Sequence, residues 1–322
     1  MGADEGVGSL DHSGPVVVGI DGSSSAQAAV LWAATEATAR GRVLRIIHAV
    51  GQQAILVVDP EATPGADDEP RPGGPRRLLD DAVEHARTAG PHLVIETRLA
   101  TGAPAAALLD EGTNACLVVL GSRGLGGFTG LLLGSVGVQV AAHARCPVVV
   151  VRPTVATSSA RSSGRVVVGV DGSQASDRAL TFGFAAAARR SLGVTMVRAW
   201  QPPVPVHPSL LIPLEDLHEA EHLQLLASLA TVRQHYPGVD VTIALVNDHP
   251  AHALAVESDG ASLLVVGSRG LGGFAGLLLG SVSQAVLRHA RCPVAVVGPG
   301  PTADDPTGPS ALPRPMSAGD GT

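Results

Sequence analysis

The chain contains no lysine, so all 22 of its basic residues are arginines. This absence excludes a P-loop of the GxxxxGK(S/T) type, whose lysine contacts the phosphates, and it excludes a catalytic lysine that forms a Schiff base. Against 29 acidic residues, the arginines leave a formal charge of −7. We expect no nucleic-acid partner, because such partners are held largely by clustered basic side chains that neutralise phosphates.

Aromatic residues are also scarce, at 2% of the chain, whereas hydrophobic residues make up 45%. The core must therefore be built from valine, leucine, isoleucine and alanine, a composition that suits buried parallel strands under alanine-rich helices. Cysteine is rare and odd in number, which favours a reducing compartment over a disulfide framework; the three residues are Cys116, Cys146 and Cys292.

Signals for export or membrane insertion are missing as well. The first residues carry Asp4 and Glu5 where a signal peptide would be positively charged. No apolar run approaches the roughly 18 residues of a membrane span. We therefore expect a cytoplasmic protein without a membrane partner.

An internal repeat dominates what the sequence does contain. The segment Val16–Ser23 returns as Val166–Ser173, an offset of 150 with seven of eight residues identical. The segment GSRGLGGFTGLLLGS at Gly121–Ser135 returns at Gly267–Ser281, an offset of 146 with fourteen of fifteen identical. Two copies of one domain therefore lie head to tail.

The repeat also sets the expected domain boundaries. We predict domains at residues 15–152 and 165–298, joined by a linker at 153–164 that is rich in serine and threonine. Residues 1–14 and the Pro/Gly-rich residues 299–322 are expected to be disordered, because such a tail cannot bury enough apolar surface to become ordered.

Each copy alternates apolar runs with helical patterns, which predicts an α/β fold with a parallel sheet covered by helices on both faces. The first-copy helices are expected at Ser24–Arg40, Pro75–Ala89, Ala103–Thr113 and Ser135–His143. The expected strands are Pro15–Ile20, Val43–Ala49, His92–Leu99, Cys116–Leu120 and Pro147–Val151, followed in the second copy by Arg165–Val170, Val194–Ala199, Val239–Leu245, Ser262–Val266 and Pro293–Val297.

Polar turns with glycine follow two of these strands, at Asp21–Ser23 and at Gly121–Gly124. In open α/β sheets, ligands bind at the carboxyl ends of neighbouring strands whose connections leave to opposite faces. If the first and fourth strands are those neighbours, the two turns converge on one crevice.

The glycine-rich segment has the spacing Gly121-x2-Gly124-x9-Gly134-Ser135. Glycines allow positive φ and a close approach of the backbone, so that successive amides can face an anion. We expect a positive φ at Gly124. Ser135 is expected to be the N-cap of the next helix, whose start offers free amides and a hydroxyl to a phosphate. This predicts a phosphate site without lysine, although glycines can also merely shape a loop.

These segments resemble those of the universal stress protein family, in the tandem form common in mycobacteria and other actinobacteria. The pattern G-x2-G-x9-G-(S/T) is complete in both copies. The resemblance implies two doubly wound, Rossmann-like domains of the adenine nucleotide alpha hydrolase-like type, each with strand order 3-2-1-4-5 and each holding one ATP.

The resemblance also implies which residues contact the nucleotide. In the first copy these are Gly19, Asp21, Ala49, Gly121, Ser122, Arg123, Gly124, Leu125, Gly126, Gly127, Gly134, Ser135 and Val136. In the second copy they are Gly169, Asp171, Ala199, Gly267, Ser268, Arg269, Gly270, Leu271, Gly272, Gly273, Gly280, Ser281 and Val282.

Some of these residues, and three others outside the two lists, need a separate interpretation. Asp21 and its equivalent Asp171 can hold a ribose hydroxyl or Mg²⁺, or can simply bond their own turn. Arg123 can reach a phosphate or face solvent. Trp200 can pack at the end of its strand or stack on adenine, and Cys146 is expected to be a small buried hydrophobic residue, as is Cys292.

Two other motifs in the second copy compete with the ATP site. His218–His222 spells H-E-x-x-H, the zinc-site spacing on a helix, but the first copy has Asp81–His85 there. The glycines from Gly270 onward match a dinucleotide fingerprint, yet they follow a fourth strand and lack the later acidic residue. Neither motif displaces the ATP site.

The phosphate site and the resemblance together imply an ATP-binding stress-response protein that regulates an unidentified partner. No residue is placed as a general base or nucleophile, so catalysis is at most slow ATP hydrolysis. Open sheet edges need covering, and the resemblance implies that the two copies pair internally through their last strands. A homodimer of the whole chain is the further possibility.

Overall fold

The computed structural model describes residues 13–51, 74–125, 133–153, 164–201, 213–271 and 278–298. Of the segments expected to be disordered, residues 1–12 and 299–322 lie outside these residues, as does most of the linker. The first copy contains β1 (Val16–Ile20), α1 (Ser24–Arg40), β2 (Leu44–Val50), α2 (Pro75–Ala89), β3 (Ile95–Thr101), α3 (Pro104–Gly112), β4 (Leu117–Gly121), α4 (Ser135–His143) and β5 (Val148–Val151). The second contains β6 (Val166–Gly169), α5 (Gln174–Arg189), β7 (Val194–Trp200), α6 (Leu214–Arg233), β8 (Val241–Asn247), α7 (Pro250–Glu257), β9 (Leu263–Gly267), α8 (Ser281–His289) and β10 (Val294–Val297).

Every strand and first-copy helix predicted from the sequence is present. Helices α1, α2 and α4 have the predicted bounds, and the strands begin and end within three residues of prediction. Local signals explain this agreement for α1: the Ser23 hydroxyl caps its start by accepting the Ala26 amide, and Gly41 ends it in the left-handed conformation at φ 60°.

The strands of each copy form a parallel sheet in the expected order 3-2-1-4-5. Strand β1 pairs with both β2 and β4. Strands β2 and β3 therefore lie on one side of β1 and strands β4 and β5 on the other, so the strand order reverses at β1. The second copy repeats this arrangement around β6, which pairs with β7 and β9. The crevice expected at such a reversal lies at the carboxyl ends of the two central strands.

Alternate residues of the strands enter two cores, one on each face of the sheet. On one face, Val16 and Val18 pack under the alanines of α1 and under Leu79 of α2. On the other, Val17 and Val118 pack against Leu108 of α3 and Val140 of α4. Small alanines let α1 approach the sheet closely, which places its first turn beside the crevice.

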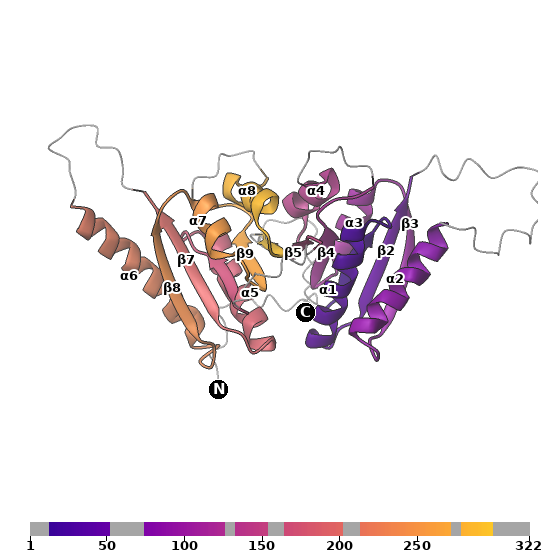
Figure 1. The fold of residues 1–322 in the computed structure, drawn as a ribbon, viewed down its shortest axis with the longest axis horizontal. Coiled ribbons are helices and arrows are strands. Elements are labelled where there is room, and N and C mark those ends of the chain that lie inside the picture. Colours follow the sequence, from indigo (N-terminus) through magenta and orange to yellow (C-terminus); the bar gives the residue numbers. More distant parts are fainter. Residues whose placement is uncertain are drawn as a thin grey trace, which may run out of the picture.

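The two copies join through their last strands, as expected. Strand β10 pairs with β5 in antiparallel register, with Ala295 opposite Val149. The result is one sheet in the order β3-β2-β1-β4-β5-β10-β9-β6-β7-β8, with α1 and α5 near the junction and α2 and α6 at the two outer ends (Figure 1). Pairing covers two strand edges of pure valine and alanine that would otherwise be open to association.

The three cysteines are buried, and none of them forms a disulfide. Burial raises the pKa of the Cys146 thiol to about 12 and that of Cys292 to about 11. Both therefore act as small apolar side chains, as predicted. Within the described parts of the chain, no helix has the length and apolar character needed to cross a membrane.

Candidate functional site

An aspartate connects the two turns that the sequence analysis expected to converge. The Asp21 carboxylate accepts the Ser23 amide on Oδ1 at 3.0 Å and the Leu125 amide on Oδ2 at 2.8 Å. In the second copy, Asp171 accepts the amides of Ser173 at 2.9 Å and Leu271 at 3.1 Å. The first bond is the turn interaction that was the alternative role of this aspartate. The second joins the first-strand turn to the glycine-rich segment that begins at Gly121, or at Gly267 in the second copy, which we call the glycine loop.

The glycine after the arginine permits this contact. A Cβ on Gly124 would lie 2.5 Å from Asp21 Oδ2, and one on Gly270 would lie 2.2 Å from Asp171 Oδ2. The expectation of positive φ was wrong here, because among the described site glycines the left-handed backbone occurs instead at Gly22 and its equivalent in the second copy. Gly124 is required by the close approach of a carboxylate and not by its own backbone angles.

The helix that follows the glycine loop also differs from prediction in one detail. Gly134, not Ser135, is the N-cap of α4; it has φ −73° and ψ 152°, and no side chain caps the helix. Gly280 takes the same place before Ser281 at the start of α8. Because each serine is the first helical residue, its hydroxyl does not cap its own helix and the amides of that first turn remain available to an anion.

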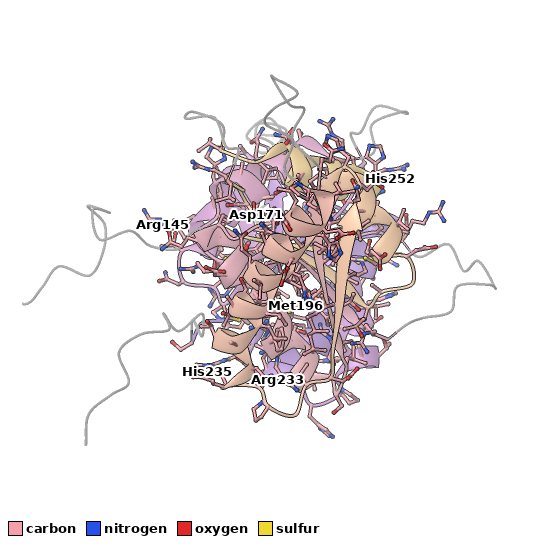
Figure 2. All side chains as sticks on the ribbon, turned by 90° about the vertical axis from the view of Figure 1, so that its left-hand side faces the viewer. Arg145, Asp171, Met196, Arg233, His235 and His252 are labelled. Carbon is pink, nitrogen blue, oxygen red and sulfur yellow. The ribbon has the colours of Figure 1, made fainter. Side chains whose placement is uncertain are left out.

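A cavity of about 450 Å³ lies at this edge of the second copy. Among the predicted residues its lining includes Gly169, Asp171, Ala199, Gly267, Arg269, Gly270, Leu271, Gly280, Ser281 and Val282. Figure 2 shows Asp171 toward the end of the sheet where His252 lies and away from Arg233 and His235. The carboxyl ends of the strands and the start of α8 therefore meet around one hollow.

The remaining predicted residues fall into two groups. Ser268 is buried and does not line the cavity; its amide donates to Val297 O at 2.8 Å, and its carbonyl accepts the Gly280 amide at 2.8 Å. Ser122 makes the same two bonds in the first copy. These serines hold the loop against the last strand. Four predicted glycines lie outside the described residues: Gly126, Gly127, Gly272 and Gly273.

The first copy presents the same elements in equivalent positions. Gly19 lies on β1, Ala49 on β2 and Gly121 at the end of β4, while Val136 follows Ser135 in α4. Arg123 is exposed, as is Arg269, and both begin the glycine loop. The strand register places the ends of β1, β2 and β4 side by side.

Serines that the sequence analysis did not single out fix the turns. In the first copy, the Ser25 hydroxyl donates to Arg123 O and accepts the Arg123 amide at 3.3 Å. The second copy has alanine at that position, and the Ser176 hydroxyl instead accepts the Gly172 amide at 3.3 Å. In α8, Ser283 donates to Gly267 O at 2.7 Å, where the first copy has a glycine. Comparison of the two copies would have shown that these serines are replaced by alanine or glycine in the other copy. It would not have shown which groups their hydroxyls bond.

Trp200 packs on the side of α6 and away from the cavity lining. Its ring meets that of His218 edge-on, with centroids 6.0 Å apart. Arg198, two residues earlier on the same face of β7, pairs with Glu221 and donates to Gln224 at 2.5 Å. His218 and His222 are exposed, and no group of three metal-ligating side chains occurs among the residues whose positions are described.

Charge near the two sites is uneven. Burial, and then the neighbouring Asp171 carboxylate, raises the pKa of Asp177 in the first turn of α5. At the first site, burial and then the charge of Arg123 lower the pKa of Arg152. Asp177 has no acidic equivalent in the first turn of α1, so the second copy carries one more carboxylate there.

Comparisons with known proteins agree with this architecture. The sequence profile of the universal stress protein family matches residues 13–152 and again residues 163–298. The chain is 37% identical over 285 residues to universal stress protein Rv2623 of Mycobacterium tuberculosis, covering 87% of this chain and 95% of that protein. It is 33% identical over 293 residues to a universal stress protein of Mycolicibacterium smegmatis, covering 88% and 97%.

A solved structure shares the overall fold. The crystal structure of a universal stress protein from Archaeoglobus fulgidus superimposes with a TM-score of 0.62 at 21% identity, covering 91% of this chain and 99% of that one. The family profile spans both copies, and the mycobacterial relatives match along nearly their whole length. The chain therefore belongs to the universal stress protein family, in its tandem form.

Proposed function

We propose that each copy binds one ATP at the crevice between its first and fourth strands. The observation that carries this proposal is the convergence of three features in the second copy: the Asp171 turn, the glycine loop and the start of α8 all line one cavity of about 450 Å³. This volume is within the range of small-molecule sites, roughly 300 to 1,000 Å³.

Different residues of the cavity lining suit different parts of the nucleotide. The amides at the start of α8 and the Ser281 hydroxyl suit the phosphates, because helix starts favour anions. Arg269 adds a positive charge at the same edge. The apolar side, formed by Val197, Ala199 and Leu254, suits the adenine ring.

The aspartates fit a role beside the phosphates. Each carboxylate oxygen of Asp171 accepts one amide, which leaves further lone pairs for a ribose hydroxyl or for Mg²⁺. Mg²⁺ is commonly held by one carboxylate together with the phosphates. Asp21 has the same bonding in the first copy.

We propose a regulatory binding role and not an efficient catalyst. Among the described residues of the cavity lining, the titratable side chains are Asp171 and Arg269. Both oxygens of Asp171 already accept amides, and an arginine stays protonated, so neither is a strong general base. The lining therefore favours nucleotide binding over catalysis, with slow hydrolysis as the alternative. We further propose that the protein is a nucleotide-dependent regulator that acts on a protein partner in the cytoplasm.

The test is to identify the ligand that purifies with the protein. The full chain, prepared without added nucleotide, is denatured, and the released small molecules are identified by mass spectrometry. We expect adenine nucleotide from the natural protein and none from a folded variant carrying both Gly124→Asp and Gly270→Asp. Release of a different molecule in stoichiometric amount would contradict the assignment.

A further inference from the structure

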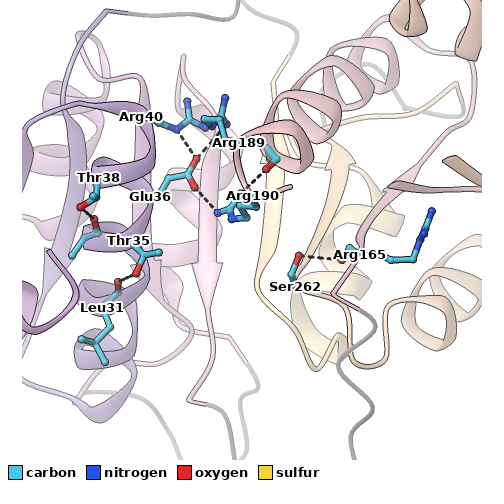
Figure 3. A network of polar contacts seen from close by, with 11 residues as sticks. Leu31, Thr35, Glu36, Thr38, Arg40, Arg165, Arg189, Arg190 and Ser262 are labelled. Atoms are coloured by element: carbon cyan, nitrogen blue, oxygen red, sulfur yellow. Dashed lines mark hydrogen bonds and ion pairs between the residues drawn. The ribbon is translucent and has the colours of Figure 1, made fainter. Parts of the chain in front are cut away.

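Four charged side chains meet where α1 of the first copy faces α5 of the second. Glu36 is 1% exposed and lies at the centre, and three arginines surround it, with side chains 9% exposed at Arg40, 24% at Arg189 and 19% at Arg190 (Figure 3). Glu36 Oε1 accepts Arg40 Nε at 2.5 Å and Arg189 Nη2 at 3.3 Å, and Oε2 accepts Arg190 Nη2.

The cluster follows the internal repeat. Arg40 and Arg190 occupy equivalent positions, 150 residues apart, and each reaches across to an aromatic ring of the other copy. The Arg40 guanidinium lies 5.5 Å from the Phe182 ring centroid, and that of Arg190 lies 5.3 Å from the Trp32 centroid. Phe182 and Trp32 are themselves equivalent, so the junction is close to two-fold symmetric.

The charges break this symmetry. The residue equivalent to Glu36 is Ala186, and the residue equivalent to Arg189 is Ala39. Three guanidinium groups therefore share one carboxylate, which leaves a net charge of +2 from three positive groups and one negative group. A symmetric junction with a second glutamate would have balanced the two equivalent arginines.

The imbalance leaves buried donors without partners. Arg40 Nη2 and Arg189 Nε are both buried and make no hydrogen bond. Their guanidinium groups are neighbours, because both donate to the same Glu36 oxygen. An unsatisfied buried donor is costly, and more so when it is charged.

Burial lowers the pKa of Arg189 and of Arg190, but an arginine stays protonated in proteins. Burial raises the pKa of Glu36, but the charges of Arg40, Arg190 and Arg189 outweigh it and hold that pKa below its ordinary value. Glu36 is therefore ionised at neutral pH and fixes the guanidinium groups. The Arg189 side chain is 24% exposed, so the cluster extends to the protein surface at this residue.

We propose that this junction is a binding site for a small tetrahedral oxyanion of the phosphate class, held between α1 and α5 by Arg40 Nη2 and Arg189 Nε. A dianion balances the net charge of +2, and its oxygens accept several hydrogen bonds at once from guanidinium groups. The anion takes the place of the carboxylate that Ala186 lacks. The site is separate from the proposed ATP sites and does not depend on them.

The experiment titrates inorganic phosphate into the full chain by calorimetry. Phosphate can also enter the nucleotide sites, so the informative quantity is the difference between variants. Ala186→Glu supplies the missing carboxylate, and Arg189→Ala removes one of the unpaired donors. Arg233→Ala is the matched control, because Arg233 is an exposed arginine on α6 in the same copy.

We expect Ala186→Glu and Arg189→Ala each to lose one phosphate site per chain, or to weaken it at least tenfold, while Arg233→Ala binds as the natural protein does. Ala186→Glu should also raise the melting temperature in phosphate-free buffer, since it pairs the free donors. Arg189→Ala keeps the test decisive if Ala186→Glu fails to fold.

Three results would overturn the proposal. One is phosphate binding that is equal in number and affinity in the natural protein, Ala186→Glu and Arg189→Ala. Another is phosphate binding that is lost with Gly270→Asp and kept with Ala186→Glu, because that would place the anion at the nucleotide site. The third is the absence of any phosphate binding to the natural protein.

Discussion

Replacement of Gly270 by alanine tests the contact on which the proposed site depends. The added Cβ would lie 2.2 Å from Asp171 Oδ2, so the carboxylate must move. That movement removes the 3.1 Å bond from the Leu271 amide, while Ser173 still holds the other oxygen. A hydrogen bond to a charged group contributes about 1.5 to 3 kcal/mol.

This energy converts directly into affinity if the Asp171 contact shapes the loop that binds ATP. At about 1.4 kcal/mol for each tenfold change, the second site should weaken roughly ten- to a hundredfold. The first site, with its own Asp21 contact, should be unaffected. Gly270→Asp should be harsher, because it adds a negative charge beside the phosphates.

The assay is calorimetric titration of ATP into nucleotide-free protein, which should change from two similar sites to one strong and one weak site. Gly238→Ala is the control, since a Cβ there meets nothing within 4 Å. Gly124→Ala should give the mirror result in the first copy. Unchanged affinity at both sites in folded Gly270→Ala protein would refute the role of this contact.

Three further predictions concern the phosphate side, the junction and the strand edge. Ser135→Ala with Ser281→Ala should weaken ATP binding about ten- to a hundredfold at both sites in equilibrium dialysis, because each removes a hydroxyl expected to bond a phosphate. Glu36→Gln should lower the free energy of unfolding by about 3 kcal/mol at neutral pH, since it leaves partly buried guanidinium groups uncompensated. Because the folded-state pKa of Glu36 is lowered, its contribution is full above the ordinary value of 4.5 and is lost as the pH falls below it, so urea unfolding curves of the two proteins should converge in acid. A half-chain ending at Thr154 exposes the β5 edge and should dimerise in light scattering, where a stable monomer would argue against this account.

Much of the fold could be predicted because the signals are local or repeated. Apolar runs fixed the strands to within three residues, and Ser23 with Gly41 bounded α1. These features depend on neighbours in the chain or on comparison of its halves. The pairing of β5 with β10 was implied instead by the resemblance to the universal stress protein family.

The details of the site depend on distances between segments that are far apart in the chain. Asp21 and Leu125 are 104 residues apart, so their bond could not be predicted from either segment alone. For the same reason the role of Gly124 was assigned to its backbone angles and not to a carboxylate nearby. The replacement of Glu36 by alanine in the second copy can be seen by comparing the two copies. Only the structure shows that Glu36 pairs with Arg189.

The most direct test of the central claim is the number of ATP molecules that the folded, nucleotide-free chain binds. Protein is unfolded to remove any bound nucleotide, refolded, checked by circular dichroism and titrated with ATP. The account predicts two sites per chain, each abolished separately by Gly124→Asp or Gly270→Asp and both by the pair. Absence of ATP binding to the folded protein, or two sites that survive the paired substitution, would contradict it.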